Sequence, residues 1–371
     1  MKIALVCDDL IQHGGHEKVV LDFCEIFPDA ILHTTAMSES WEKKLNEKNI
    51  KYVTSFMQKF PFKEKLARVY APFLFYILAL ENFEFDDYDV VISLSSRFAH
   101  GVITKPNTKH ICYMSTVGRM FWEPASYFEK ENFGGTALIK SFGMLFLKPF
   151  ISYIRLWDKL ASQRVDYFIA NSITTQKRIE KYYKRKSEVI HPSFDLPEEK
   201  LSNVSENYFL VLTRLAPWKR VDIAVKSCLK LNLKLKVLGD GPAKADLEVL
   251  AKGNENIELL GYVSEKDKSS YLKECKALIN TQYEDFGIVP LEAMYCGKPI
   301  IAYAKGGVLE TVIPDVTGVY FTEQSERALS KVLIDFDEKK FLPESCREQA
   351  MNFSKERFIK EITDLVVNYA M

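Results

Sequence analysis

The sequence has no surplus of either charge. Lys plus Arg number 50 and Asp plus Glu number 50, so the formal net charge is zero. A protein devoted to nucleic acids normally has a clear basic surplus, and we therefore expect no nucleic-acid partner. An acidic disordered chain is disfavoured as well, because 47% of the residues are hydrophobic, as in a globular protein with a full core. The 371 residues exceed one ordinary domain of about 100–200 residues, which predicts two domains.

Paired cysteines and long apolar runs are also missing. The seven cysteines are scattered and include no Cys-x-x-Cys pair, so we expect free thiols in a reducing compartment. The longest unbroken apolar run, 69–80, is shorter than the ~18 residues of a membrane span. The first strand-like run, 3–6, is too short for a secretory leader. We therefore expect a cytoplasmic protein, with peripheral attachment to the inner face of the cell membrane as the membrane-associated alternative.

Strand-like and helix-like runs alternate along nearly the whole chain. In the first half we expect strands at 3–7, 30–34, 90–94, 110–114 and 167–170, and helices at 14–27 and 174–183. A polar stretch at 197–207 indicates a linker. In the second half we expect strands at 208–213, 234–238, 257–260, 277–280, 299–303 and 318–321, and helices at 221–231, 243–251, 266–274 and near 290–296.

This alternation predicts an α/β protein with parallel sheets that are covered by helices on both faces. We expect two doubly wound, Rossmann-like domains, 1–195 and 196–353, that face each other across a cleft. The last segment, 354–371, has a helical pattern and is predicted to return to the N-terminal domain. Ligands of such sheets bind at the carboxyl ends of the strands, so these ends are where functional residues are expected.

The most informative segment is Glu284-Asp-Phe-Gly-Ile-Val-Pro-Leu-Glu292. It follows a predicted strand, Gly287 permits a tight turn, and Pro290 suits the first turn of a helix. Glu284 is therefore expected in the loop and Glu292 about one turn into the helix, beside a helix N-terminus that offers N–H groups to a phosphate. Carboxylates accept hydrogen bonds from diols. For either glutamate alone, ordinary helix capping is the simpler explanation, but the whole string suits a sugar nucleotide.

This string resembles the Glu-x7-Glu hallmark of the retaining glycosyltransferases of family 4, which have the two-domain GT-B architecture. Four further segments are similar to that family: 208–222 with Arg214 and Lys219, Gly239-Asp-Gly-Pro242, Gly261-Tyr-Val263, and Gly14-Gly15 after the first strand. Finer likenesses resemble a subgroup that often uses GDP-mannose, and they lie at 88–93, 110–113, 155–158, 165–172 and 178–183.

The resemblance implies a role for each matching residue. Arg214 and Lys219 would hold the donor pyrophosphate, Glu292 the ribose hydroxyls and Glu284 the donor sugar. The remaining donor-binding residues would be Gly14, Gly15, Val263, Phe286, Gly287, Ile288 and Val289, the last four through backbone N–H groups. A guanidinium and an ammonium do suit one diphosphate, although without the glutamate string a solvated basic turn would be the simpler interpretation of Arg214 and Lys219.

The implied reaction moves a hexose, with mannose favoured, from a nucleotide diphosphate sugar to a glycan or lipid-linked acceptor in surface polysaccharide assembly. GDP-mannose is the first expectation for the donor and a UDP-sugar the second. The family needs no metal, so we expect no cofactor. An Asp-x-Asp string at 87–89 immediately precedes a strand and is interpreted as a turn. A nicotinamide enzyme is disfavoured because the Gly-x-Gly-x-x-Gly fingerprint is missing, and a pyridoxal phosphate phosphorylase because those chains are far longer.

One position departs from the subgroup. Where related chains have His-Thr-Pro-Met-Arg after the strand at 110–114, this chain has Ser115-Thr-Val-Gly-Arg119. Ser115 can form a hydrogen bond but has no imidazole to titrate. We expect Glu284, Ser115 and Arg119 to be the catalytic residues, with Trp122 and Glu123 near the acceptor. We favour activity because the other donor-binding residues are present. The alternative is a weak or inactive homologue that serves as a sugar-nucleotide-binding or complex subunit.

Two other features concern surfaces and loops. Residues 51–80 interleave aromatic side chains with five basic residues and one acidic residue, a composition that suits anionic lipid headgroups. A plain solvated face is the competing interpretation of this segment. His13 and His16 flank the Gly14-Gly15 pair; both are expected to be loop residues, although either could face the acceptor.

Overall fold

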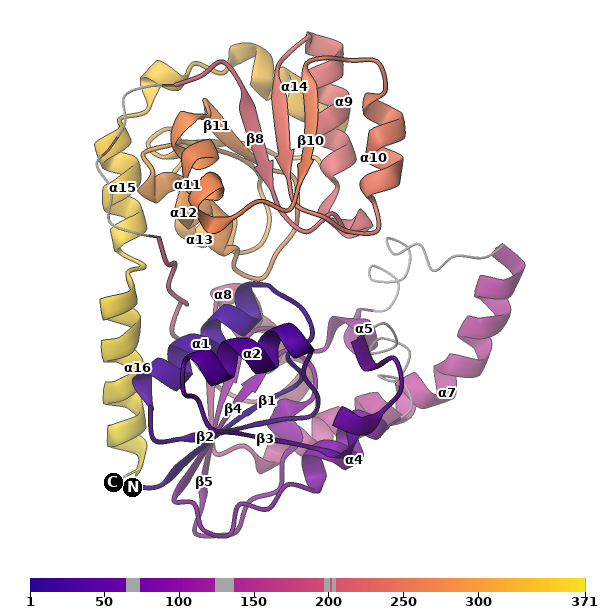
Figure 1. Ribbon diagram of the computed structural model, residues 1–371, viewed down its shortest axis with the longest axis vertical. Coiled ribbons are helices and arrows are strands. Elements are labelled where there is room, and N and C mark those ends of the chain that lie inside the picture. The colour runs from indigo at the N-terminus through magenta and orange to yellow at the C-terminus, as the bar shows by residue number, and fades with distance from the viewer. Residues whose placement is uncertain (65–73, 124–136, 197–200, 202–204, 371) are drawn as a thin grey trace. The chain divides into compact units, whose positions relative to one another are not determined.

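A computed structural model describes residues 1–64, 74–123, 137–196, 201 and 205–370 (Figure 1). The described chain divides into two compact units. The first holds the described residues up to His191 and those from Ile359 on, and the second holds those from Pro192 to Phe358. Most of the predicted linker at 197–207, and residues 69–73 of the longest apolar run, lie outside the described residues.

The first unit is built on a parallel sheet whose described strands have the order β3-β2-β1-β4-β5-β6-β7. They are β1 (Ile3–Cys7), β2 (Ile31–Thr34), β3 (Tyr52–Thr54), β4 (Val90–Ser95), β5 (Lys109–Met114), β6 (Tyr167–Ala170) and β7 (Glu188–Val189). The order reverses between β1 and β4, which makes the sheet doubly wound. Val6 pairs with Ser93 and Ser93 with Cys112, so β1, β4 and β5 end at the same edge.

Helices cover this sheet on both faces (Figure 1). The α-helices are α1 (Gly15–Ile26), α2 (Glu39–Glu47), α4 (Phe75–Glu81), α5 (Arg119–Trp122), α7 (Ala137–Ala161), α8 (Ile173–Arg178) and α16 (Lys355–Ala370). Shorter helical turns are η1 (Phe56–Lys59), η3 (Ala99–Gly101), η4 (Ser162–Arg164) and the π-helix η5 (Ile179–Tyr183). In the part of the chain that the structure describes, no helix is both long and apolar enough to cross a bilayer.

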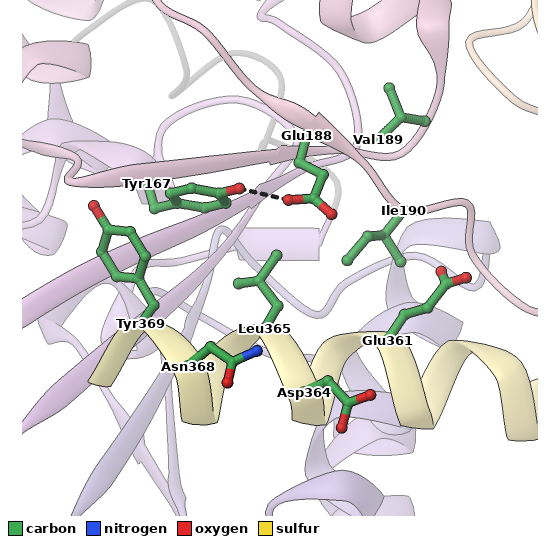
Figure 2. A pocket seen from close by; sticks show the side chains of 9 residues that line it. All are labelled: Tyr167, Glu188, Val189, Ile190, Glu361, Asp364, Leu365, Asn368 and Tyr369. Atoms are coloured by element: carbon green, nitrogen blue, oxygen red, sulfur yellow. Dashed lines mark hydrogen bonds between the residues drawn. The ribbon is translucent and has the colours of Figure 1, made fainter. Parts of the chain in front are cut away.

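The C-terminal helix α16 lies along the edge strand of the first sheet. The rings of Tyr369 on α16 and Tyr167 on β6 are 4.6 Å apart. A cavity of about 450 Å³ lies between α16 and strands β6 and β7, and Tyr167 donates a hydrogen bond to Glu188 in its wall (Figure 2). From Ile359 on, the last helix of the chain therefore belongs to the first unit.

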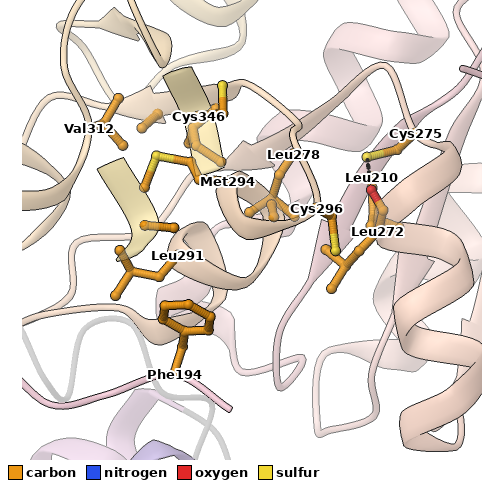
Figure 3. Close-up of a cluster of buried hydrophobic side chains, with 14 of the residues drawn as sticks. Phe194, Leu210, Leu272, Cys275, Leu278, Leu291, Met294, Cys296, Val312 and Cys346 are labelled. Atoms are coloured by element: carbon orange, nitrogen blue, oxygen red, sulfur yellow. Dashed lines mark hydrogen bonds between the residues drawn. The ribbon is translucent and has the colours of Figure 1, made fainter. Parts of the chain in front are cut away.

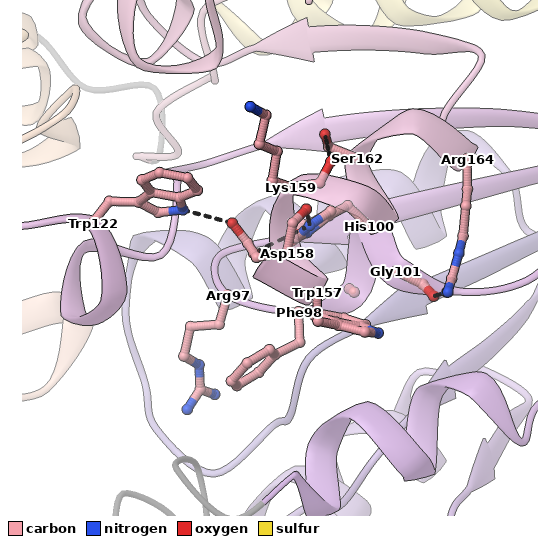
Figure 4. A network of polar contacts seen from close by, with 12 residues as sticks. Arg97, Phe98, His100, Gly101, Trp122, Trp157, Asp158, Lys159, Ser162 and Arg164 are labelled. Atoms are coloured by element: carbon pink, nitrogen blue, oxygen red, sulfur yellow. Dashed lines mark hydrogen bonds and ion pairs between the residues drawn. The ribbon is translucent and has the colours of Figure 1, made fainter. Parts of the chain in front are cut away.

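A buried polar network joins α5 and α7 to the end of β4 (Figure 4). Asp158 on α7 accepts a hydrogen bond from Trp122 Nε1 at 2.6 Å, and its other oxygen lies 3.3 Å from His100 Nε2. His100 and Asp158 are both fully buried. Gly101 is required beside them, because a Cβ at this position would overlap the Trp157 ring. These contacts hold the short helix α5, and with it Arg119, at the carboxyl end of β5.

The second unit is also doubly wound. Its described strands have the order β10-β9-β8-β11-β12-β13, with the reversal between β8 and β11. They are β8 (Phe209–Leu212), β9 (Leu235–Leu238), β10 (Ile257–Gly261), β11 (Ala277–Asn280), β12 (Ile300–Tyr303) and β13 (Gly318–Phe321). Its helices are α9 (Val221–Leu231), α10 (Lys244–Ala251), α11 (Glu265–Glu274), α12 (Ile288–Tyr295), α13 (Val308–Thr311), α14 (Glu326–Asp335) and α15 (Pro343–Met351), with turns η6 (Pro217–Lys219) and η7 (Glu338–Lys340).

Two buried apolar clusters flank the second sheet, and one of them fixes α12. In that cluster Leu291 and Met294 of α12 pack with Leu278 of β11 and Cys346 of α15 (Figure 3). All seven cysteines of the chain are free and buried, as the sequence predicts. Burial raises the pKa of the Cys275 thiol to about 12, so this group stays protonated and apolar in the core. The two parallel sheets confirm the predicted α/β class with two doubly wound domains.

Candidate functional site

The carboxyl edge of the second sheet gathers polar groups at the point where the strand order reverses. Thr213, directly after β8, donates a hydrogen bond from Oγ1 to Gln282 Oε1 at 3.0 Å. Gln282, which follows β11, donates from Nε2 to Glu284 Oε2 at 2.7 Å. A hydrogen-bonded chain thus runs from the end of β8 to Glu284. Thr213 lies in the segment 208–222 but was not among its expected site residues, and Gln282 lies outside every segment that resembles the family.

Lys219 and Glu284, 65 positions apart in the sequence, form an ion pair at this edge. Lys219 ends the turn η6 and is buried. Its carbonyl accepts a hydrogen bond from Thr281 Oγ1 at 2.8 Å, and its Nζ lies 4.2 Å from the ring centroid of Trp218. The position of the ammonium is therefore set from both its backbone and its side chain. Arg214 leaves the same strand end two residues after β8 and is half-buried.

The loop that carries Glu284 is held by backbone contacts from the end of β12. Glu284 pairs with Gly306 in a parallel bridge, and the Gly307 N–H donates to the Glu284 carbonyl at 3.0 Å. Gly306 has a φ of 82°, and a Cβ there would overlap the Glu284 carbonyl. A side chain at position 306 is thus excluded on two grounds.

Helix α12 begins directly after Gly287, whose φ is 90°, and no side chain caps its N-terminus. Phe286 is buried, with its ring 5.9 Å from that of Phe353. Ile288 and Val289 are partly buried against the same apolar cluster. The side chains of these residues therefore stabilise the core. A role of their backbone N–H groups in ligand binding stays a prediction.

Glu292 lies on the second turn of α12 and is only 4% exposed. Its Oε1 is 3.2 Å from Nζ of Lys268 on α11, which also lies 2.6 Å from Oε2 of Glu265. Burial alone would lower the pKa of Lys268, but the Glu292 and Glu265 carboxylates outweigh it and raise the pKa. Lys268 is a candidate site residue that sequence reasoning missed, because no local pattern connects it to Glu292.

The ends of β8, β9 and β10 are bound together by backbone hydrogen bonds. The Gly239 N–H donates to the Gly261 carbonyl at 2.7 Å, and the Leu215 N–H to the Asp240 carbonyl at 2.8 Å. Gly239 has a φ of 128°, and a Cβ there would overlap the Thr213 carbonyl. Val263, two residues beyond β10, is partly buried against the core beside the exposed Tyr262. These contacts place Val263 at the same edge of the sheet as Arg214.

In the first unit, Asp8 organises the edge between β1 and β4. Its Oδ2 accepts hydrogen bonds from the Ser96 N–H, the Ser96 hydroxyl and the Arg97 N–H, and its Oδ1 from the N–H groups of Phe98 and Ala99, at 2.6–2.9 Å. Burial by itself raises the pKa of Asp8, but Arg97, His16 and the backbone donors outweigh burial and lower it. A charged carboxylate thus ties the loop after β4 to the end of β1.

Asp9 and Arg97 form a second polar group at this edge. Arg97 donates to Asp9 Oδ2 at 2.5 Å, and the Tyr76 hydroxyl donates to the same oxygen at 2.6 Å. Burial alone would lower the pKa of Arg97, but the Asp9 carboxylate outweighs it, so the pKa is raised and the guanidinium stays charged. Neither Asp9 nor Arg97 was singled out by the sequence analysis.

Ser115 lies just beyond β5 at the same edge, where its N–H donates to the Ser95 carbonyl at 2.8 Å. Its Oγ is 2.9 Å from Nδ1 of His16. The interpretation of His16 as a loop residue is wrong, because His16 lies in the first turn of α1, directly after Gly14 and Gly15. The structure therefore brings together the glycine pair and Ser115, and it adds an imidazole between them.

Three residues that follow Ser115, namely Arg119, Trp122 and Glu123, contact other residues of the first unit. Arg119 Nε lies 3.7 Å from Glu123 Oε2, and Glu123 accepts a hydrogen bond from Arg178 Nε at 3.0 Å. Trp122 stacks on Tyr182 with ring centroids 4.7 Å apart. Trp122 and Glu123 thus serve packing and ion pairing, and Arg119 is held by Glu123 beside the end of β5.

The Asp-x-Asp string has a structural role at the start of the first sheet. Asp89 accepts a hydrogen bond from the Lys2 N–H at 2.7 Å, and Asp87 lies 3.7 Å from Lys2 Nζ. These contacts agree with the interpretation of residues 87–89 as a turn before β4. Across the described ranges, no group of three or more His, Cys, Asp or Glu side chains is arranged to hold a metal ion.

The chain is similar to known glycosyltransferases in sequence and in structure. Residues 192–353 match the family model described as glycosyl transferases group 1. An uncharacterized glycosyltransferase of Methanocaldococcus jannaschii is 28% identical over 205 residues, which cover 54% of this chain and 58% of that protein. The mouse alpha-1,3/1,6-mannosyltransferase ALG2 is 28% identical over 223 residues, 47% of this chain and 52% of that protein. The chain thus spans about half the length of these curated relatives.

A solved structure has the same fold over nearly the entire chain. The crystal structure of HepE from Anabaena in complex with UDP aligns with a TM-score of 0.72, at 19% identity, and covers 99% of this chain and 100% of that chain. Two doubly wound parallel-sheet units with this match define a protein of the GT-B class. Within that class, residues 192–353 are similar to the glycosyl transferases group 1 family.

Proposed function

We propose that this protein is a retaining glycosyltransferase that moves a hexose from a nucleotide diphosphate sugar to a glycan or lipid-linked acceptor in surface polysaccharide assembly. The observation that carries the proposal is the pairing of Lys219 with Glu284 and of Lys268 with Glu292 at one edge of the second sheet. Both carboxylates flank the uncapped N-terminus of α12. This edge lies at the reversal of strand order, where doubly wound sheets bind ligands.

Each group has a distinct proposed task. The Lys219 ammonium and the Arg214 guanidinium would neutralise the donor diphosphate, and the first N–H groups of α12 would add hydrogen bonds. The donor phosphate would compete with Glu284 for Lys219. This exchange would free the Glu284 carboxylate to accept hydrogen bonds from the sugar hydroxyls. Glu292, held by Lys268, would accept hydrogen bonds from the ribose hydroxyls. Preorganised donors of this kind stabilise the negative charge that develops on the leaving diphosphate.

Retention is proposed to follow same-face attack, in which the leaving phosphate assists the deprotonation of the acceptor. We assign no nucleophile to the protein for this step. Closure of the site on the donor would exclude the water that would otherwise hydrolyse it.

GDP-mannose is the proposed donor and mannose the transferred hexose, with a UDP-sugar as the second choice for the donor. The mannosyltransferase ALG2 among the relatives supports the first, and the UDP complex of HepE supports the second. A thermal-shift panel of nucleoside diphosphates separates them, because a ligand that binds only the folded state raises the unfolding midpoint. A response to GDP without a response to UDP supports the mannose donor, and the reverse pattern refutes it.

Activity is tested by transfer and by donor hydrolysis in matched lysine variants. Lys219→Ala is expected to lower kcat about 10²- to 10³-fold, the usual effect of removing one preorganised donor to a developing charge. Lys230→Ala is the control, because Lys230 is largely exposed and pairs with Glu326 on α14. Equal rates for wild type and Glu284→Ala would refute an enzymatic role and favour a sugar-nucleotide-binding subunit.

We also propose that the first unit attaches to anionic membranes through residues 51–80, of which 51–64 and 74–80 are described. Large apolar side chains are exposed there: Phe56 at 41%, Phe62 at 71% and Leu78 at 55%. Lys51 and Lys59 of the same segment are also exposed, and basic groups together with apolar side chains suit anionic headgroups. Wild type is expected to co-sediment with anionic liposomes at low salt and Phe62→Glu to do so less. Failure of the wild type to co-sediment would refute the proposal.

A further inference from the structure

The imidazole of His16 lies at the carboxyl edge of the first sheet in an arrangement that the donor-binding roles do not use. His16 is in the first turn of α1, while Ser115 follows β5, and the two are 99 positions apart in the sequence. Their side chains meet because β1, β4 and β5 are neighbours and end together. The 2.9 Å contact between His16 Nδ1 and Ser115 Oγ fixes one side of the ring.

The other side of the ring has no hydrogen-bond partner among the described residues. Nε2 of His16 is buried and forms no hydrogen bond with any described residue. Burying a polar atom without a partner destabilises the folded state, so such atoms are uncommon in stable proteins. His13, two positions before Gly15, contrasts with His16: it is exposed, stacks on Trp41 at 5.0 Å and has its Nε2 3.3 Å from the Ser40 hydroxyl.

The charged groups that face His16 are Asp8 and Asp9 after β1 and Arg97 after β4. Burial lowers the pKa of the His16 imidazole and outweighs the Asp8 carboxylate, which raises it, so the ring is neutral at pH 7. A neutral imidazole has one donor and one acceptor nitrogen. The Ser115 hydroxyl can donate to Nδ1 or accept from it, so Nε2 can act as either a donor or an acceptor.

We propose that His16 contacts the substrate, with Nε2 hydrogen-bonded to a sugar hydroxyl and Ser115 orienting the ring. This inference rests on the proposed glycosyl transfer and adds a recognition residue from the first unit. It also gives Ser115 a defined role. Ser115 positions an imidazole that is supplied by α1.

The sugar hydroxyl can belong to the donor hexose or to the acceptor glycan. The two sources are distinguished by measuring donor hydrolysis without acceptor and transfer with acceptor. A contact to the donor hexose lowers both rates when His16 is changed. A contact to the acceptor lowers transfer and raises its KM for acceptor, while donor hydrolysis is unchanged.

Two substitutions separate the two ring nitrogens. His16→Asn keeps a polar atom near the position of Nδ1, where it can still contact Ser115, but removes Nε2. His16→Gln places its amide near the position of Nε2. A substrate contact through Nε2 predicts that His16→Asn lowers transfer about 10- to 100-fold and that His16→Gln restores part of it. A structural role through Ser115 predicts the opposite order and would overturn the inference.

The controls test the loop, the fold and the proposed function separately. His13→Asn alters the loop that precedes α1 and is expected to leave transfer unchanged. The shift in unfolding midpoint with GDP or UDP reports the second unit and is expected to be equal in wild type and His16→Asn. In wild type the transfer rate should fall with decreasing pH only below pH 6.5, as His16 becomes protonated. This fall should be absent in His16→Gln. Retained transfer in His16→Asn overturns the inference alone, whereas a wild type without nucleotide binding and without transfer overturns the proposed function and this inference with it.

Discussion

The pairing of Lys268 with Glu292 leads to a prediction about the stability of the second unit. The side chains of Lys268 and Glu292 are 13% and 5% exposed, so their attraction is screened less than that of a surface pair. Removing one partner of a buried pair leaves an uncompensated charge and costs about 3–5 kcal/mol. We take the lower end, about 3 kcal/mol, for Lys268→Met, because the side chain of Lys268 is not fully buried.

The expected change is large enough to measure by thermal unfolding. For domains of about 150–250 residues, 1 kcal/mol shifts Tm by about 2–4 °C, so Lys268→Met should lower the Tm of the second unit by about 6–12 °C. The matched control is Lys266→Met, an exposed lysine on the same helix, which should change stability by less than about 0.5 kcal/mol. The double variant Lys268→Met with Glu292→Met should recover much of the loss, because it removes both charges together.

The pH dependence of the stabilisation by the Lys268–Glu292 pair follows from the raised pKa of Lys268. A cation whose pKa is raised in the folded state stabilises it fully below the unfolded pKa, about 10.4, and loses this effect as the pH rises through the folded pKa. The difference in Tm between wild type and Lys268→Met should therefore be constant from about pH 6 to pH 9. A difference no larger than that of Lys266→Met would refute the reasoning about the buried pair.

Three further substitutions test the described contacts. Asp8→Asn should destabilise the first unit by several kcal/mol, because hydrogen bonds to a charged group are each worth about 1.5–3 kcal/mol. Since the pKa of Asp8 is lowered in the folded state, the wild type should lose this stability as the pH falls below about 4, whereas Asp8→Asn should not. Denaturant midpoints at several pH values measure both effects. Gly239→Ala should reduce both stability and nucleotide affinity, because it adds a backbone overlap to an unfavourable φ, whereas Gly253→Ala, with open space around the new Cβ, should cost only the strain of its φ, about 1 kcal/mol. Trp122→Phe leaves the buried Asp158 without one donor and should lower the Tm of the first unit, an effect absent if the indole N–H contributes nothing.

Much of the fold could be predicted from local pattern. The strand at 167–170 and the helix at 221–231 have the bounds that the sequence predicts. The edge strands β3 and β7 were missed, because three or two residues carry too little periodicity to be recognised. The helix α7 was missed as well, since Lys140, Lys148 and Pro149 interrupt its apolar pattern and the helix continues through Pro149.

The site was predictable only where one short segment contains it. The string from Glu284 to Glu292 includes the turn, the helix start and both carboxylates, so its local geometry follows from residue type. Lys268 could not be connected to Glu292 in the same way. Their contact depends on how α11 packs against α12, and this packing is set by the shared apolar cluster rather than by any spacing in the sequence.

The sequence by itself determined the α/β class, the two doubly wound halves and the residue types at the ends of the strands, because these follow from periodicity and local turn chemistry. Only the tertiary structure decided which of these groups meet. Parallel strands that are neighbours in a sheet can be far apart in the chain, so the strand order brings Lys219 to Glu284 and His16 to Ser115. The sheet thus brings an imidazole beside Ser115.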